Sequence, residues 1–333
     1  MPILSRTDLP DDLIQIVRSS PVSRLTTVTP KGRPIVEALL HGPDPSGSAI
    51  DYGTGLAYPS KAERARAHPA VGLLFLGSEM AGSSVGIIAA HAAVRDSDLQ
   101  LNTDRWVQQY RAGWMPDGVL DLPWWEAVWY FVRIYISCTP LCAWWWSDGD
   151  LDRSPSEWAR TDTSSLLASD PAPVGAPSRA ARSEPVQWEP VADDVLARGL
   201  PLPVLAGASV AGHPLPVPTL EAVRAPGGFR VRVPSSIPWS LEGSACLSFE
   251  GVRASPPGIG AGFVGECVAD GDSYHFVVDH VLPPNPRANG YAQDPGSHLF
   301  PEERVRERLV RRLRHELDRR GASMPIVRGL ADP

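Results

Sequence analysis

The chain has 333 residues, which is enough for two domains of ordinary size that each bury their own core. A hydrophobic content of 43% and a charged content of 21% are typical of a folded globular protein and not of a disordered one. The formal net charge of −7 gives the chain no general attraction for DNA or for anionic membrane surfaces. We therefore expect a folded protein that binds neither nucleic acid nor membrane.

Targeting signals and cysteine pairs are also missing from the sequence. The N-terminal segment MPILSRTDLPDDL lacks the basic start and apolar run of a signal peptide, and no stretch of about 20 apolar residues follows anywhere. We expect a cytoplasmic protein. Its four cysteines, Cys138, Cys142, Cys246 and Cys267, lie in apolar strand-like sequence without metal-ligand spacing. The sequence therefore predicts buried thiols and no metal site.

The first half of the chain alternates helices with apolar strands. Thr7 or Asp8 is a suitable cap for a first helix that places Leu9, Leu13 and Ile16 on one face. A second long helix is expected from Asp98 to Trp114. Apolar, β-branched runs predict strands at residues 24–28, 34–40, 50–52, 71–76, 85–94, 129–137 and 141–146.

The stretch from Asp51 to Phe75 is the most informative part of this half. It predicts a strand, a glycine-containing turn, a short helix and a second strand. Ser60 and Glu63 fit a capping box at the helix start, and Pro69 ends the helix. Lys61 and Lys31 are the only lysines in the chain, and Lys31 lies in a predicted turn. A helix N-terminus offers free N–H groups and a partial positive charge, so this turn is a candidate phosphate site, with simple capping as the alternative.

The second half repeats features of the first. After a segment rich in Ser, Asp, Ala and Pro, five residues from Asp11 to Val28 recur in the same order from Asp193 to Val210. Gly32-Arg33-Pro34 recurs as Gly212-His213-Pro214, and Leu73-x-Phe75 recurs as Leu247-x-Phe249. The order of the matches and their slowly drifting offset predict a diverged internal duplication.

The two predicted copies differ at the candidate phosphate turn. In place of Ser60-Lys61-Ala62-Glu63, the second copy has a shortened segment, residues 234–239, with no lysine and no capped helix. A final helix is expected from Pro301 to Arg320, docked through Val305, Leu309, Leu313 and Leu317.

The ordered segments LTTV, GRPIVEALL, AIDYGTG, SKAERARAHPAVGLLF, VGIIAAHAAV and VRIYI resemble the flavin-binding split-barrel family that includes pyridoxamine 5′-phosphate oxidase. The resemblance covers Leu13 to Ser147 and, more faintly, Val195 to Leu282. It implies a mainly β (α+β) fold of two split β-barrels with peripheral helices, packed as an internal pseudo-dimer, with a homodimer of such chains left open. The expected divisions are a barrel at 1–147, a linker or surface excursion at 148–187, a degenerate barrel at 188–300, and a C-terminal helix and tail at 301–333.

The resemblance also implies a cofactor site. Members of this family bind FMN, or in some branches a deazaflavin or haem, in a groove between two barrels. Ser60 and Lys61 match the phosphate-binding serine and basic residue, and Arg64 replaces a second basic residue. The remaining matches are to residues near the flavin ring, namely Tyr52, Gly53 and Thr54 on one strand, Arg33 on the strand beneath it, and Trp144 on the final strand.

The leading hypothesis is an FMN-dependent oxidoreductase that acts on a small organic molecule, in which the cofactor performs the redox step. No catalytic residue is assigned. The alternatives are a non-catalytic split-barrel module that binds a ligand without cofactor, and a relative that binds haem or a deazaflavin. The sequence has no HExxH motif, no glycine-rich nucleotide loop and no recognisable Ser-His-Asp set, which disfavours hydrolysis and the use of nucleoside triphosphates.

Overall fold

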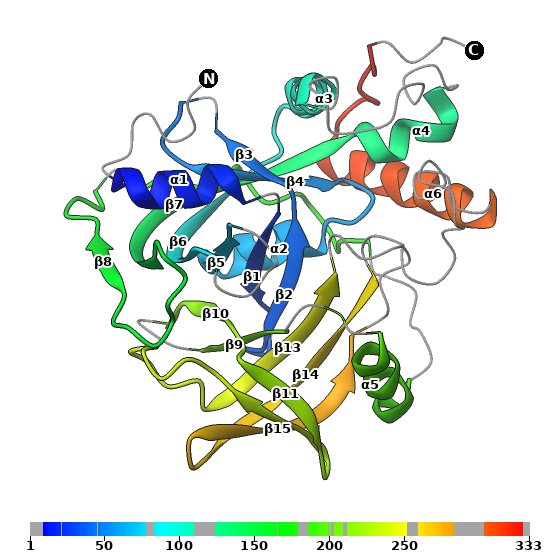
Figure 1. Ribbon diagram of the computed structural model, residues 1–333. Coiled ribbons are helices and arrows are strands. Elements are labelled where there is room, and N and C mark those ends of the chain that lie inside the picture. Colours follow the sequence, from blue (N-terminus) through cyan, green and yellow to red (C-terminus); the bar gives the residue numbers. More distant parts are fainter. Residues whose placement is uncertain are drawn as a thin grey trace.

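The computed structural model describes residues 9–20, 22–44, 46–77, 83–109, 124–164, 166–178, 186–198, 200, 203–208, 212–251, 259–282 and 303–328. They form two curled antiparallel sheets, one from each half of the chain, with helices around them (Figure 1). The fold is therefore two split β-barrels, as expected. Within the described residues, no helix has both the length and the apolar content that crossing a bilayer requires.

The first sheet has the strand order β2-β1-β5-β6-β7-β4-β3, and β8 pairs with β7. Its strands are β1 (Ser23–Val28), β2 (Pro34–Leu39), β3 (His41–Pro43), β4 (Ile50–Gly55), β5 (Ala70–Leu76), β6 (Val85–Arg95), β7 (Arg133–Trp146) and β8 (Ser156–Ala159). The helices of this half are α1 (Asp11–Ser19), α2 (Ser60–Ala67), α3 (Leu99–Gln109) and α4 (Trp124–Phe131).

The second sheet has the order β10-β9-β13-β14-β15-β12-β11, which reproduces the order of the first sheet strand for strand. Its strands are β9 (Val204–Ala208), β10 (Pro214–Pro218), β11 (Glu221–Ala225), β12 (Gly228–Arg232), β13 (Gly243–Gly251), β14 (Ile259–Asp270) and β15 (Ser273–Val281). The remaining helices are α5 (Trp188–Ala197) and α6 (Glu303–Arg320). The shared order confirms the predicted duplication, and no helix lies between β12 and β13 where the first copy has α2.

A β-bulge recurs at the same place in both sheets. Between β6 and β7 the register shifts after Ala89 and leaves Leu141 unpaired, and between β14 and β15 it shifts after Val264 and leaves Asp279 unpaired. In the first sheet Pro140 pairs with Ala90 next to the bulge, so β7 continues through the proline. The expected strands at 129–137 and 141–146 were therefore wrong in their bounds, because residues 133–146 form one strand and Trp129 belongs to α4.

The strand registers also correct the sequence alignment of the copies. Val28 pairs with Pro34 in the first sheet, and Ala208 pairs with Pro214 in the second. Since Pro214 is the equivalent of Pro34, the equivalent of Val28 is Ala208 and not Val210, which lies outside the described residues. The predicted match of the first strands was out of register by two residues, a shift that leaves the buried face unchanged.

Two hydrophobic clusters hold the molecule together. One fills the first barrel and includes Leu309, Leu313 and Leu317 of α6, so the last helix docks on the first copy (Figure 1). The other fills the second barrel and extends to Val36 and Leu74 on the outer face of the first sheet. The copies therefore share one continuous apolar layer.

The contacts between the copies are reciprocal. β2 contacts β13, and its equivalent β10 contacts β5, the equivalent of β13. The pairs β2 with β9 and β10 with β1 follow the same rule. Each copy thus covers the edge strand of the other, as in a two-fold symmetric dimer.

The two edge strands satisfy their backbone groups differently. In β2 the N–H groups of Val36 and Ala38 donate to the side chains of Cys246 and Glu250 on β13. The equivalent positions in β10 are Pro216 and Pro218, which carry no N–H to satisfy. The first-copy edge therefore requires polar partners, whereas the second-copy edge is closed by proline.

The burial of Glu250 at this edge predicts that the free energy of unfolding depends on pH. Burial raises the pKa of Glu250 to about 7, so the folded chain holds a proton that the unfolded chain releases above the ordinary glutamate value of 4.5. Stability should therefore fall as the pH rises from 4.5 to 7, by at most about 1.4 kcal/mol per pH unit. Urea unfolding of the Glu250→Gln variant between pH 5 and 8 should show less of this decline than the parent chain. Glu221→Gln, which changes a half-exposed glutamate of β11, is the control, and identical slopes in all three chains would contradict the assignment.

Candidate functional site

The helix α2 lies at the centre of the candidate site, but its first turn differs from the expectation. The helix begins at Ser60 with Pro59 at the N-cap, and no side chain caps it. Glu63 does not return to the helix start, because it pairs with Arg319 of α6 at 3.1 Å. The predicted capping box was therefore wrong, and Ser60 remains exposed at the first helical position.

Lys61 and Arg64 converge on one carboxylate. They lie three residues apart and therefore on the same face of α2. Lys61 Nζ lies 3.0 Å from Glu37 Oε1, and Arg64 Nη2 lies 2.5 Å from Glu37 Oε2. Arg64 Nε also donates to the hydroxyl of Thr27 on β1 at 2.7 Å. The structure thus brings together the two basic residues that the sequence singled out and adds Glu37 of β2 between them.

Glu37 is ionised in this arrangement. Burial acts to raise its pKa, but the charges of Lys61 and Arg64 and their hydrogen bonds outweigh burial, so the pKa of Glu37 lies below its ordinary value. Two cations then face one carboxylate, which leaves the set with one excess positive charge.

The set retains donors for a further anion. Among the described residues, Arg64 Nη1 and two of the three Lys61 hydrogens have no recorded partner. The first backbone bond of α2 runs from Glu63 N–H to Pro59 O, so the N–H groups of Ser60, Lys61 and Ala62 precede it. This donor chemistry fits a phosphate group in the presence of Glu37.

The predicted ring-facing residues of β4 are largely packed into the first barrel. The Tyr52 side chain is fully buried and its hydroxyl accepts a hydrogen bond from Ser23 at 3.0 Å. A Cβ atom on Gly53 would lie 2.9 Å from the Trp106 ring of α3, and the Thr54 hydroxyl donates to Tyr58 O at 3.4 Å. On the side of β4 that faces β3, residues 53–55 have no strand partner, because β3 pairs with residues 50–52 alone.

Arg33 and Trp144 face the second copy. Arg33 pairs with Asp279, the bulge residue of β15, at 2.7 Å. The Trp144 ring lies 4.7 Å from the Trp239 ring between centroids. Neither has a recorded contact with Lys61 or Arg64, so the predicted set is only partly brought together. Glu37 was missed, although it is the only charged residue in the apolar strand PIVEAL.

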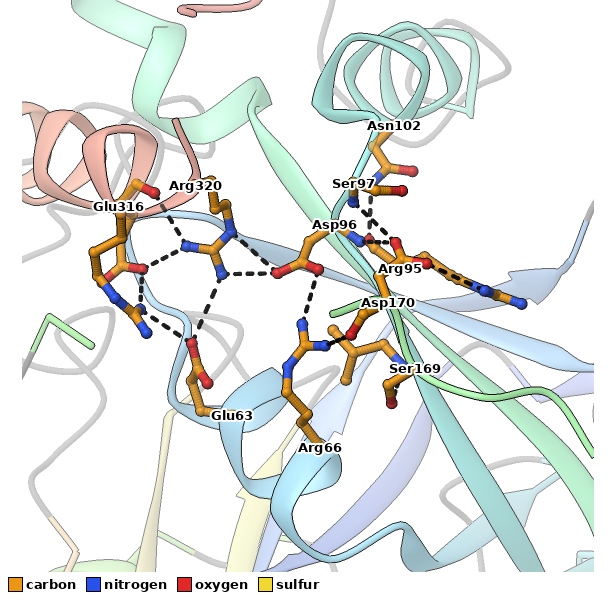
Figure 2. A network of polar contacts seen from close by, with 12 residues as sticks. Glu63, Arg66, Arg95, Asp96, Ser97, Asn102, Ser169, Asp170, Glu316 and Arg320 are labelled. Carbon is orange, nitrogen blue, oxygen red and sulfur yellow. Dashed lines mark hydrogen bonds and ion pairs between the residues drawn. The ribbon is translucent and has the colours of Figure 1, made fainter. Parts of the chain in front are cut away.

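The opposite side of α2 is tied down by a network of ion pairs (Figure 2). Arg66 donates to Asp96 at 2.8 Å, and Asp96 also accepts from Arg320 of α6 at 2.9 Å. Glu63 accepts from Arg319 at 3.1 Å. Helix α2 is therefore held from both faces, with Lys61 and Arg64 on one side and Glu63 and Arg66 on the other.

Glu316 is the most buried member of this network. Its side chain has no exposed surface, and it accepts hydrogen bonds from Arg319 and Arg320 at 2.6 Å each and from the N–H of Ser178. Asp170 extends the network by accepting from the N–H groups that follow β6. The network has equal numbers of acidic and basic side chains, so its charges balance. The acidic residues are Glu63, Asp96, Asp170 and Glu316, and the basic residues are Arg66, Arg95, Arg319 and Arg320.

Comparison with known proteins finds likeness at the level of fold. No family model matches the chain, and no curated protein matches it. The solved structures that match include a putative pyridoxamine 5′-phosphate oxidase from Listeria innocua, at 19% identity and a TM-score of 0.29, over 39% of this chain and 91% of that one. They also include an FAD-binding protein from Mesorhizobium loti, at 14% identity and a TM-score of 0.30, over 40% of this chain and 92% of that one. A third is the heme storage protein HutZ from Vibrio cholerae, at 17% identity and a TM-score of 0.30, over 40% of this chain and 89% of that one.

These matches include proteins of the kind that the sequence resembles, and each spans somewhat less than half of this chain. The FAD and heme in their names describe those proteins and not this chain. The function of this chain therefore has to be argued from its own residues.

The network makes a prediction for Glu316. Replacing it with glutamine leaves Arg319 and Arg320 buried with less counter-charge, so Glu316→Gln should lower the free energy of unfolding by about 3 kcal/mol. The matched control on the same helix is Glu307→Gln, whose partner Arg311 lies 3.8 Å away on the exposed face, and it should cost less than about 0.5 kcal/mol. Urea denaturation measures both, and equal losses would show that the network does not anchor α6.

Proposed function

We propose that this protein binds a flavin-type cofactor by its phosphate at Lys61 and Arg64 and uses it as an oxidoreductase on a small organic molecule. The observation that carries the proposal is the convergence of both cations at the start of α2, with an excess positive charge and unused donors. A bound flavin would supply the electron or hydride transfer, while the chain binds and orients it.

The residues of α2 have distinct tasks in this proposal. Lys61 provides a compact positive charge, and Arg64 provides a planar set of donors. The N–H groups of the first turn add the partial positive charge of the helix end. Because ion pairs fix α2 from both faces, these donors are preorganised and little side-chain entropy is lost when a ligand binds.

Only the first copy has these groups. The segment between β12 and β13 contains no helix, and the position equivalent to Glu37 is Val217 in β10. The proposal therefore assigns one cofactor site to each chain. FMN and a deazaflavin are the candidates for this site that the sequence resemblance brings. Haem, which has carboxylates and no phosphate, is an alternative that its absorption spectrum would distinguish.

A second candidate is a non-catalytic module that binds a ligand without cofactor. It is favoured by the positions predicted to face the ring, where the protein's own aromatic side chains already lie. Trp106 covers Gly53, and Trp144 packs against Trp239.

The spectrum of the purified chain and its titration with flavins test the proposal. Lys61→Ala should weaken cofactor binding about 10- to 100-fold, because a charge-assisted hydrogen bond to the phosphate is lost. Lys31→Ala is the matched control, since it removes the only other lysine, which is exposed in the β1–β2 turn. A parent chain that binds neither FMN nor a deazaflavin would reject the function, and uptake of haem in their place would favour the haem-binding alternative. A Lys61→Ala variant that binds as tightly as Lys31→Ala would reject the site.

A further inference from the structure

Any anion that reaches Lys61 and Arg64 meets a carboxylate that both residues already bind. Glu37 uses Oε1 for Lys61 and Oε2 for Arg64, so neither cation can be approached without approaching Glu37. A simple phosphate site would consist of donors alone. The carboxylate in its middle therefore has to influence which ligand binds.

The backbone around Glu37 is held in place, so Glu37 cannot move away from the site when a ligand binds. Its backbone pairs with Leu25 in the β1–β2 ladder, and its neighbours Val36 and Ala38 donate their N–H groups to Cys246 and Glu250 of the second copy. Only 30% of the Glu37 side chain is exposed. Its negative charge stays beside the ligand, in surroundings where solvent screens it incompletely.

The charge balance then favours one class of anion. Lys61 and Arg64 together carry two positive charges, and Glu37 carries one negative charge. The neighbouring Arg24 and Glu250 have opposite charges that cancel when Glu250 is ionised. A ligand group with one negative charge neutralises the set. A phosphate monoester is close to dianionic above pH 6 and would leave an uncompensated negative charge beside Glu37.

We propose that Glu37 selects the charge of the ligand, so that the site takes a flavin-type cofactor through a singly charged phosphodiester in preference to a doubly charged phosphate monoester such as that of FMN. This inference rests on the proposed function and sharpens it. Glu37 acts as the specificity-determining residue and takes no part in the redox step.

A matched pair of ligands tests the inference. FMN and its methyl phosphodiester differ by one charge and one methyl group, and quenching of flavin fluorescence reports the binding of each. At pH 8 the parent chain should bind the diester at least about tenfold more tightly than FMN. In Glu37→Gln, which keeps the shape of the side chain, FMN should bind at least as tightly as the diester.

Two controls separate charge selection from damage to the fold. Glu63→Gln removes the same charge from the opposite face of α2 and should keep the preference of the parent. The pH dependence is the second control. As the pH falls through about 7 and then 6, Glu250 near Glu37 and the phosphate of FMN each take up a proton. The parent should therefore gain more affinity for FMN than for the diester, whose charge is constant, whereas Glu37→Gln should not. Thermal unfolding confirms that each variant is folded.

The outcomes distinguish this inference from the proposed function. A parent chain that binds both ligands equally, with no change in Glu37→Gln, overturns charge selection and leaves cofactor binding intact. A parent that binds neither ligand, with a Glu37→Gln variant that binds FMN, supports the role of Glu37 and overturns the function proposed for the natural chain. If neither protein binds a flavin, both proposals are overturned.

Discussion

The covering of each copy's edge strand by the other copy is the constraint on which the rest of the structure depends. An edge strand exposes unpaired N–H and C=O groups, and the duplicated chain covers one edge strand of each sheet internally, β2 with β13 and β10 with β5. Gly72 lies at such a contact, because a Cβ atom there would overlap the backbone of Pro214. The backbones approach closely only because that position has no side chain, and the shared apolar layer forms around this contact.

Within this symmetric frame the two halves have diverged in chemistry. Edge strand β10 is rich in proline, whereas β2 retains N–H groups that have Cys246 and Glu250 as partners. The ion pairs of Glu37 with Lys61 and Arg64 lie on the same β2 strand. The polar half of the interface and the candidate site are therefore neighbours, and the second copy supports the site without holding one. Helix α6 adds a further restraint by fixing the far side of α2.

Much of this organisation could be predicted from local sequence. The spacing of apolar residues predicted most of the strands and α6, and the order of weak repeats predicted the duplication. Both predictions depend only on patterns along the chain. Lys61 was identified because it is one of two lysines and lies at a predicted helix start, and Arg64 because the family resemblance implies a second basic residue near it. Glu37 and Trp106 were not placed, since their partners come from other elements and only the folded sheet brings them close. The capping box was wrong for the same reason, since Glu63 pairs with Arg319 of α6. The single strand β7 was predicted as two because it continues through Pro140 and a bulge at Leu141.

The central claim is that one of two equivalent positions in a duplicated fold has become a ligand site. The most direct test is the number of ligand molecules bound per chain, measured by equilibrium titration of the purified protein with flavin ligands followed by a crystal structure of the complex. We expect one molecule per chain, with its anionic group at Lys61 and Arg64. Two molecules per chain, or one located between β12 and β13, would contradict the claim.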